Sequence, residues 1–316
     1  MKLQAFKTLL CTAATLGVLA LTGSQAQAFQ VGGWNYAIDS FNDGTEWDAT
    51  NKRLVVGQNS DFEFFGMAFR VLEDRVVFAI NSNLSLNGYD LDGARNKKIS
   101  YGDLVLNFTN TASFDAAQSS LFAIRFDSTN DTNVKVVTET RTIDSRGRAK
   151  VTKTTRTSPL GLYGGVTTNS LTNVNSGYSS HQQHTTEVAK VGGSASLGDL
   201  DANNSYFAYN TAAQTNMKSG SYLGGINMLG AADFRALGLN FGNFSATGNY
   251  TFGFSVDRSL LPVGNFMASL FAECGNDGIV MAGSTAVPEP TTMAGTAIAA
   301  GLMYTRRRRK KQEASA

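Results

Sequence analysis

Acidic residues gather in four short polar stretches, and their side chains are the oxygen ligands that Ca²⁺ prefers. The stretches are DSFNDGTEWD (39–48), DLDG (90–93), DSTND (127–131) and DLDANN (199–204). None follows the EF-hand pattern: counted from Asp199, position six is Asn204 rather than Gly and position twelve is Asn210 rather than Glu. The candidate calcium ligands are Asp90, Asp92, Asp199 and Asp201. Solvated turns use the same residue types and are the favoured explanation.

Two histidines and a cysteine complete the residues that could carry chemistry. The stretch HQQH places His181 and His184 three positions apart, so that on a helix they would share a face and could bind zinc. The neighbouring residues are polar and lack helical periodicity, which favours a solvated loop. Cys274 has no identifiable histidine partner, GxSxG and a Gly-rich phosphate loop are absent from the sequence, and no carboxylate pair stands out for glycoside hydrolysis. The sequence therefore predicts no catalytic residue, and calcium is the one candidate cofactor.

The chain ends in a three-part segment, AVPEPTTMAGTAIAAGLMYTRRRRKKQEASA (286–316). A Pro-Glu-Pro triplet precedes an uncharged run at 291–305, and a cationic run follows at 306–311. A helix over the uncharged run would rise about 23 Å and would only marginally span a hydrocarbon core of about 30 Å, with the cations on the cytoplasmic side. The residues before the prolines, Val287 and Glu289, favour an extended conformation that a protease can bind as a strand.

This segment resembles the PEP-CTERM sorting signal of bacterial exosortase substrates, and its PEPTT start is similar to the cyanobacterial subclass. The resemblance implies passage through the secretion machinery, a transient inner-membrane anchor, removal of the tail by an exosortase, and a final place at the cell surface or in extracellular polysaccharide. The sorting and processing residues are then Val287, Pro288, Glu289, Pro290, Arg306, Arg307, Arg308 and Arg309. Body stretches such as LFAIRFDSTND look like a recurring body of cyanobacterial PEP-CTERM surface proteins, which implies location but no activity.

The other end of the chain predicts export as well. Lys2 and Lys7 precede an apolar run at 9–21, and a small-x-small site formed by Ala26 and Ala28 follows. This order predicts a helical secretory signal peptide over 1–28.

The formal charge of +2 includes these two terminal segments. Without their cations, 19 of the 27 basic residues remain, and without Glu289 and Glu313, 23 of the 25 acidic residues remain. The mature body is then near −4, which argues against a nucleic-acid binder because such a protein needs a basic surface.

The elements that must position these residues are short strands separated by turns, over a body that we place at 29–283. The predicted strands cover 35–40, 62–71, 75–80, 103–108, 121–127, 161–165, 251–257 and 265–273. Phe252 and Phe254 share a face at strand spacing, whereas only AADFRALGL (231–239) looks helical. We expect an all-β fold, a two-sheet antiparallel β-sandwich of jelly-roll type, followed by the sorting signal at 284–316 with its VPEP motif at 287–290.

One segment of the body, 134–158, differs from its surroundings. It is rich in Thr, has a turn at 144–147, and carries seven basic residues against Glu139 and Asp144, for a net charge of +5. The rest of the body is then near −9. The pattern predicts a β-ribbon inserted in the sandwich and projecting from it. Its charges and Thr residues either protect an exposed edge or form a contact surface for acidic polysaccharide.

Cys274 is the one cysteine of the predicted mature chain. In NFMASLFAECGNDGIV it shares strand parity with Phe266 and Leu270, whereas Glu273 falls on the other face. We expect the thiol to face the core, because the alternative register would bury the Glu273 carboxylate.

Together these features predict an exported surface protein with a structural or adhesive role. A carbohydrate-binding module, with or without calcium, is the alternative, and a polysaccharide-active hydrolase is the third choice.

Overall fold

The computed structural model describes residues 29–146 and 148–286. The predicted signal peptide with Ala26 and Ala28 lies outside the described residues. So do the predicted membrane helix at 291–305 and the sorting residues Val287, Pro288, Glu289, Pro290, Arg306, Arg307, Arg308 and Arg309. Within the described ranges, no helix is long and apolar enough to cross a membrane.

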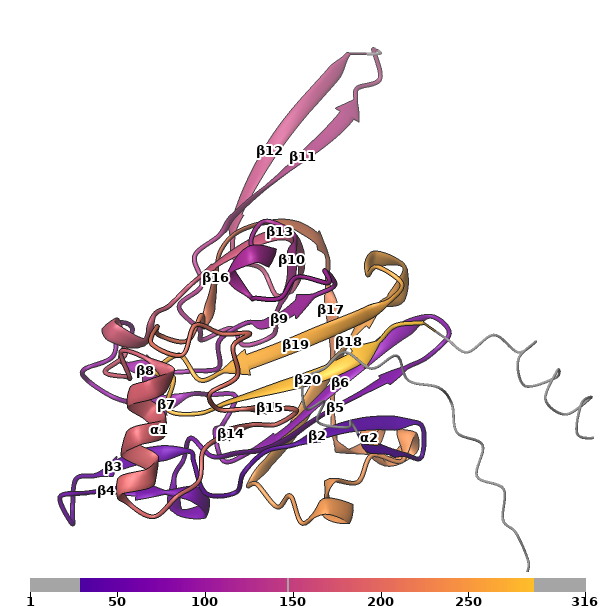
Figure 1. Ribbon diagram of the computed structural model, residues 1–316. Coiled ribbons are helices and arrows are strands. Elements are labelled where there is room, and N and C mark those ends of the chain that lie inside the picture. Colours follow the sequence, from indigo (N-terminus) through magenta and orange to yellow (C-terminus); the bar gives the residue numbers. More distant parts are fainter. Residues whose placement is uncertain (1–28, 147, 287–316) are drawn as a thin grey trace, which may run out of the picture.

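The described chain forms two six-stranded antiparallel sheets, so the all-β prediction is confirmed (Figure 1). The first sheet has the order β1 (Phe29–Val31), β2 (Trp34–Ile38), β5 (Phe64–Val71), β6 (Arg75–Ser82), β18 (Tyr250–Asp257), β17 (Ile226–Leu229). The second has the order β16 (Asn216–Gly224), β13 (Gly161–Asn169), β10 (Leu121–Arg125), β9 (Leu104–Asn107), β19 (Asn265–Phe271), β20 (Gly278–Ser284). Two-stranded hairpins complete the fold: β3 (Thr45–Asp48) with β4 (Arg53–Val56), β7 (Tyr89–Asp90) with β8 (Lys98–Ile99), β11 (Lys135–Ile143) with β12 (Ala149–Thr157), and β14 (Ser196–Leu197) with β15 (Leu200–Asp201).

One large apolar cluster takes side chains from both six-stranded sheets. The ring of Phe266 on β19 lies 5.1 Å from that of Phe69 on β5 and 6.2 Å from that of Phe78 on β6, measured between centroids. Phe252 and Phe254 of β18 both belong to the same cluster, as their two-residue spacing predicts. The alternation of apolar residues therefore produces strands that bury one face against the opposite sheet.

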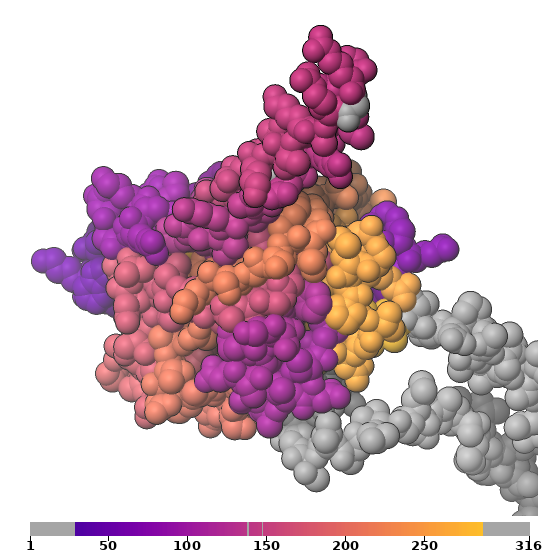
Figure 2. Space-filling view, turned by 90° about the horizontal axis from the view of Figure 1, so that it is seen from above, coloured from indigo at the N-terminus to yellow at the C-terminus, as the bar shows by residue number. Residues whose placement is uncertain are grey.

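The segment 134–158 is a projecting ribbon, as expected. Strands β11 and β12 pair along nine residues each, and every described residue of β12 is exposed. Figures 1 and 2 show the hairpin extending away from the rest of the chain. At its base, the Val134 amide donates to the Ser158 hydroxyl at 2.6 Å, and both residues are buried. The base of the ribbon is therefore fixed by this buried pair, whereas its strands project from the body.

The described part of the chain has two α-helices, of which one was predicted. Helix α2 (Ala231–Leu237) confirms the prediction for 231–239. Helix α1 (His181–Lys190) corrects the loop expected around HQQH. Its N-cap residue Ser180 accepts a hydrogen bond from the Gln183 amide, and His181, His184 and Val188 form its buried face. Two of the three residues on this i, i+3, i+7 face are histidines, so apolar periodicity does not reveal the helix.

The prediction for Cys274 is confirmed, but its reasoning is wrong in one respect. The thiol is completely buried in the main apolar cluster, and burial raises its pKa to about 12. Glu273 is completely buried too. A second apolar cluster, which includes Phe271 and Phe207, covers the outer face of β19. Both faces of β19 are therefore covered. Glu273 follows the strand by two residues, and either register would place its side chain against a covered face rather than in solvent.

The body also extends beyond the predicted boundary at 283. Strand β20 ends at Ser284, and Thr285 is buried, with its hydroxyl donating to the Pro262 carbonyl oxygen at 2.6 Å. Residues 284 and 285 are therefore part of the folded body.

Candidate metal centre

Three aspartates from distant parts of the sequence meet inside the protein. One carboxylate oxygen from each of Asp39, Asp43 and Asp277 lies within 4.8 Å of the other two. Asp39 directly follows β2, Asp43 precedes β3, and Asp277 precedes β20. Glu63, just before β5, stands beside them and adds to the negative charge around Asp43 and Asp277. All four side chains are buried, so we call them the carboxylate centre.

Each of three carboxylates in the centre uses one oxygen and leaves the other without a partner. Asp39 accepts through Oδ1 from the Ser40 and Gly198 amides, at 3.0 and 2.9 Å, and from the Ser196 hydroxyl. The second oxygens, Asp39 Oδ2, Asp43 Oδ1 and Glu63 Oε1, have no hydrogen-bond partner among the described residues. A buried oxygen without a partner is costly, so each of these three atoms requires either a proton or a bound ligand.

The used oxygens are held by backbone amides. Asp43 Oδ2 accepts from the Ser196 amide at 2.6 Å, and Glu63 Oε2 accepts from the Gly44 amide at 2.7 Å. Asp277 accepts through Oδ2 from the Phe64 amide and through Oδ1 from the Gly278 amide, both at 2.7 Å. Because backbone donors from several loops fix one side of each carboxylate, the remaining oxygens have defined directions.

Burial raises the pKa of every carboxyl group in the centre. The pKa of Asp39 rises to about 7 and that of Glu63 to about 8. For Asp43 and Asp277, burial and the neighbouring carboxylates raise the pKa well above its ordinary value. Four ionised carboxylates in a dry site repel each other, so the centre binds either protons or a cation.

Two neighbours shape the centre from outside. A side chain at Gly44 would overlap the backbone of Glu63 and place its Cβ 2.8 Å from Glu63 Oε2, so only glycine allows this close approach. On α1, His184 Nε2 lies 3.0 Å from the Asp43 carbonyl oxygen. Because a carbonyl can only accept, Nε2 carries the proton, and burial lowers the pKa of His184, which keeps the ring neutral. In Figure 1, α1 lies beside the β3–β4 hairpin that follows Asp43.

The ligand atoms in the centre are all carboxylate oxygens, which selects a hard cation. Ca²⁺ binds such oxygens at about 2.3–2.6 Å with flexible geometry, whereas Zn²⁺ prefers nitrogen and sulfur. The three-aspartate spacing of at most 4.8 Å can place one ion of this size between the oxygens. A cation would also partner the oxygens that now lack one.

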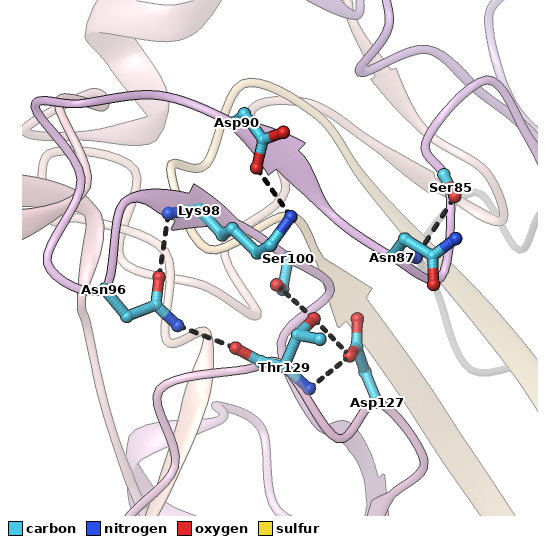
Figure 3. A network of polar contacts seen from close by, with 8 residues as sticks. All are labelled: Ser85, Asn87, Asp90, Asn96, Lys98, Ser100, Asp127 and Thr129. Carbon is cyan, nitrogen blue, oxygen red and sulfur yellow. Dashed lines mark hydrogen bonds and ion pairs between the residues drawn. The ribbon is translucent and has the colours of Figure 1, made fainter.

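The four predicted calcium ligands have other surroundings. Asp90 is exposed and pairs with the Lys98 ammonium at 2.6 Å (Figure 3). Asp92 lies 3.8 Å from Lys97 and is also exposed, as is Asp201. Asp199 is buried, and burial raises its pKa to about 6. It directly follows Gly198, whose amide binds Asp39, so it borders the carboxylate centre. The predicted ligands are therefore not brought together, although one of them adjoins the centre.

The two histidines of α1 share a face, yet they serve packing. The ring of His181 lies 5.5 Å from those of Phe207 and Phe271, between centroids, and burial lowers the pKa of His181 to about 4. Among the residues that the structure describes, the only group of three or more His, Cys, Asp or Glu side chains with metal-binding spacing is Asp39, Asp43 and Asp277.

Buried residues account for most of the net negative formal charge of the body. Eight of its acidic residues are buried, compared with one basic residue, Arg125. The buried acids are Asp39, Asp43, Glu63, Asp103, Asp127, Asp199, Glu273 and Asp277. Outside the ribbon this leaves 13 acidic and 11 basic residues at or near the surface, a net charge of about −2 rather than the −9 obtained by counting the whole segment. The ribbon is therefore a basic arm on an almost neutral surface.

None of the four nominated calcium ligands belongs to the carboxylate centre. Asp39 and Asp43 lie in the first acidic stretch, whereas Glu63 and Asp277 lie outside all four acidic stretches. A lone carboxylate at the start of a strand was the available signal. No family model, curated protein or solved structure matches the chain.

Proposed function

We propose that this is an exported surface protein whose two sheets form a β-sandwich held by a divalent cation, and that its role is structural or adhesive. The carboxylate centre carries the proposal, because three of its buried oxygens lack a partner among the described residues. A cation there joins the loop at 39–43 to Asp277, close to the two ends of the described chain. Its binding free energy then stabilises the fold as a whole.

Calcium is the cation that this site fits best. Extracellular modules bind Ca²⁺ with dissociation constants on the order of 10⁻⁴–10⁻³ M, a range suited to a protein outside the cell. Protons and calcium compete for the centre, since burial has raised the pKa values of its carboxyl groups. We therefore expect calcium to bind more tightly at pH 8 than at pH 5.

Calorimetric titration of the purified protein with CaCl₂ at pH 7.5 tests this proposal. We expect one ion per chain, and at least a 100-fold weaker affinity in Asp43→Asn, which keeps the shape of the side chain but removes the charge. Asp90→Asn is the matched control, because Asp90 is exposed and pairs with Lys98. Lack of binding at 5 mM CaCl₂, or equal affinity in wild type and Asp43→Asn, would overturn the proposal. The first result would mean that protons alone fill the centre, and the second that calcium binds at another place.

Export and processing are the second part of the proposal, and they rest on the sorting segment and the signal peptide. An exosortase recognises Val287–Pro290, the tail anchors the precursor in the inner membrane for a short time, and the body is released to the surface or matrix. Glu289→Ala should leave an uncleaved precursor in the inner membrane. Mass spectrometry of the mature surface protein is the test, and peptides covering 293–304 in that protein would contradict cleavage here.

The ribbon supports the adhesive role. Its seven basic residues stand on an exposed hairpin, and a projecting positive arm attracts polyanions over about 8–10 Å at physiological salt. Acidic extracellular polysaccharide is the partner that we propose for it. The second candidate function, a carbohydrate-binding module, is favoured by a separate feature, a cleft beside Trp47.

A further inference from the structure

A polar cleft of about 550 Å³ lies along the β3–β4 hairpin. Its lining includes Glu46, Trp47, Asp48, Arg53, Asn59 and Tyr89. The indole of Trp47 is 59% exposed and belongs to none of the three apolar clusters of the described chain. A large aromatic ring that the core does not use, at the margin of a cleft, is available for a ligand.

The acceptors of the cleft are fixed before any ligand arrives. Glu46 Oε1 accepts from the Tyr89 hydroxyl at 3.0 Å, and its Oε2 accepts from the Asp61 amide at 2.8 Å. Asp48 accepts from the Thr50 and Asn51 amides, both at 3.0 Å, and so holds the hairpin turn. These carboxylates therefore keep their positions, with lone pairs left for a further donor.

The hydrogen-bond donors of the cleft are not held in this way. Neither the guanidinium of Arg53 nor the side-chain amide of Asn59 makes a hydrogen bond to another described residue, and both residues are exposed. Arg53 lies directly across the hairpin from Asp48. The cleft thus combines fixed acceptors, unengaged donors and one exposed aromatic face.

This combination matches the surface of a sugar ring. A pyranose has hydroxyl groups that donate and accept hydrogen bonds, and a face of C–H groups that packs on an aromatic ring. The charged side chains in the cleft are Glu46 and Asp48 against Arg53, a net charge of −1, which disfavours uronic acids and sulfated sugars. From this geometry we infer that the Trp47 cleft binds a neutral polysaccharide chain.

The inference deepens the adhesive role, on which it rests, and it connects the cleft to the carboxylate centre. Strand β3 begins with Thr45, two residues after Asp43, and Thr45 is hydrogen-bonded to Asn276, the neighbour of Asp277. The Thr45 amide donates to the Asn276 carbonyl oxygen at 3.1 Å, and Asn276 Nδ2 donates to the Thr45 carbonyl oxygen at 2.9 Å. The Gly57 amide closes the base of the hairpin by donating to the Gly44 carbonyl at 3.0 Å. The loops that hold the centre therefore also hold the cleft.

Titration of the full-length protein with neutral hexasaccharides tests the inference, with cellohexaose, laminarihexaose and mannohexaose as probes and hexagalacturonate as the acidic comparison. At least one neutral probe should bind with a dissociation constant between about 10 µM and 1 mM. Trp47→Ala should weaken that affinity at least tenfold, and Arg53→Met, which keeps the aliphatic stem, at least threefold. Tyr250→Ala is the matched control, because Tyr250 is an exposed aromatic residue outside the cleft.

Three results would overturn the inference: no neutral probe binding at 5 mM, unchanged affinity in both cleft variants, or binding of hexagalacturonate that is tighter than that of every neutral probe and is lost in Trp47→Ala. Calcium titration of the same samples separates this inference from the proposed function. Calcium binding without glycan binding contradicts the cleft alone. Glycan binding that depends on Trp47, in a protein that takes up no calcium, supports the cleft and contradicts the cation.

Discussion

Replacing Glu273 by Gln should remove the part of the pH dependence of stability that this residue contributes. Glu273 is completely buried, and its Oε1 accepts from the Asp131 amide at 2.7 Å and from Asn216 Nδ2 at 2.6 Å. Its Oε2 accepts from the Ser100 amide at 3.3 Å. Burial is the main reason that its pKa rises from 4.5 to about 8, so the folded protein favours the neutral acid.

The sign and size of the effect follow from this pKa. Since the folded pKa is raised, the contribution of Glu273 to stability is complete below pH 4.5 and is lost as pH rises through about 8. The loss is about 1.4 kcal/mol per pH unit in that window. Glutamine cannot ionise, so the difference in unfolding free energy between Glu273→Gln and wild type should change by about 4 kcal/mol from pH 5 to pH 9 in favour of the variant. At pH 5 the variant should be less stable by about 1 kcal/mol, because the Ser100 amide loses its acceptor.

Urea unfolding of both proteins at five pH values between 5 and 9, with calcium constant, measures this difference. Glu187→Gln is the control, since Glu187 is partly exposed and pairs with Lys190, and we expect it to change stability by less than about 0.5 kcal/mol. A difference between Glu273→Gln and wild type that stays constant from pH 5 to pH 9 would refute the reasoning. It would show that the three donors keep the carboxylate ionised throughout.

Three further predictions concern the cation, the ribbon and the thiol. Calcium at 100 times its dissociation constant should stabilise the body by about 2.7 kcal/mol and raise its melting temperature by about 5–10 °C in scanning calorimetry at pH 8. The rise should be smaller at pH 5, where carboxyl groups with pKa values raised to about 7 and 8 hold their protons; an equal rise at both pH values would contradict this. Deleting 135–156, outside the buried pair Val134 and Ser158, should lower the melting temperature by a few degrees at most, and global unfolding would show that the ribbon belongs to the core. Cys274 should react with a thiol reagent at pH 8 at least 100 times more slowly in the native than in the urea-unfolded protein, because burial raises its pKa to about 12; rapid native labelling would contradict its burial.

The strands and the ribbon could be predicted because local patterns determine them. Phe252 and Phe254 alternate with smaller residues, and this pattern is typical of a strand that packs one face on a core. The ribbon was readable for the opposite reason: its strands carry charge and threonine on both faces, and neither face can be buried.

What the sequence could not predict depends on contacts between distant segments. Strand β19 is covered on its second face by Phe207 and its neighbours, more than 60 residues away in sequence, so the position of Glu273 follows from packing and not from alternation. Half of the residues of helix α1 are His, Thr or Val, which have modest helix propensity, and the helix is stabilised by its Ser180 cap and by the burial of His181, His184 and Val188. The carboxylate centre needs Asp277 beside Asp43, which no local pattern encodes.

The position of the centre in the chain has a consequence for the order in which the protein assembles. Thr45 and Asn276, which flank the centre and bind each other, are 231 residues apart. Closing a loop of that length costs about 5 kcal/mol of chain entropy, so this contact forms late in folding. If the chain is exported N-terminus first, as proposed, Asp39 and Asp43 leave the translocation channel long before Asp277. The last of the proposed ligands is then available only when almost the whole body has passed through, so a calcium ion bound there would join the end of β2 to the start of β20 as the final step of folding rather than its starting point.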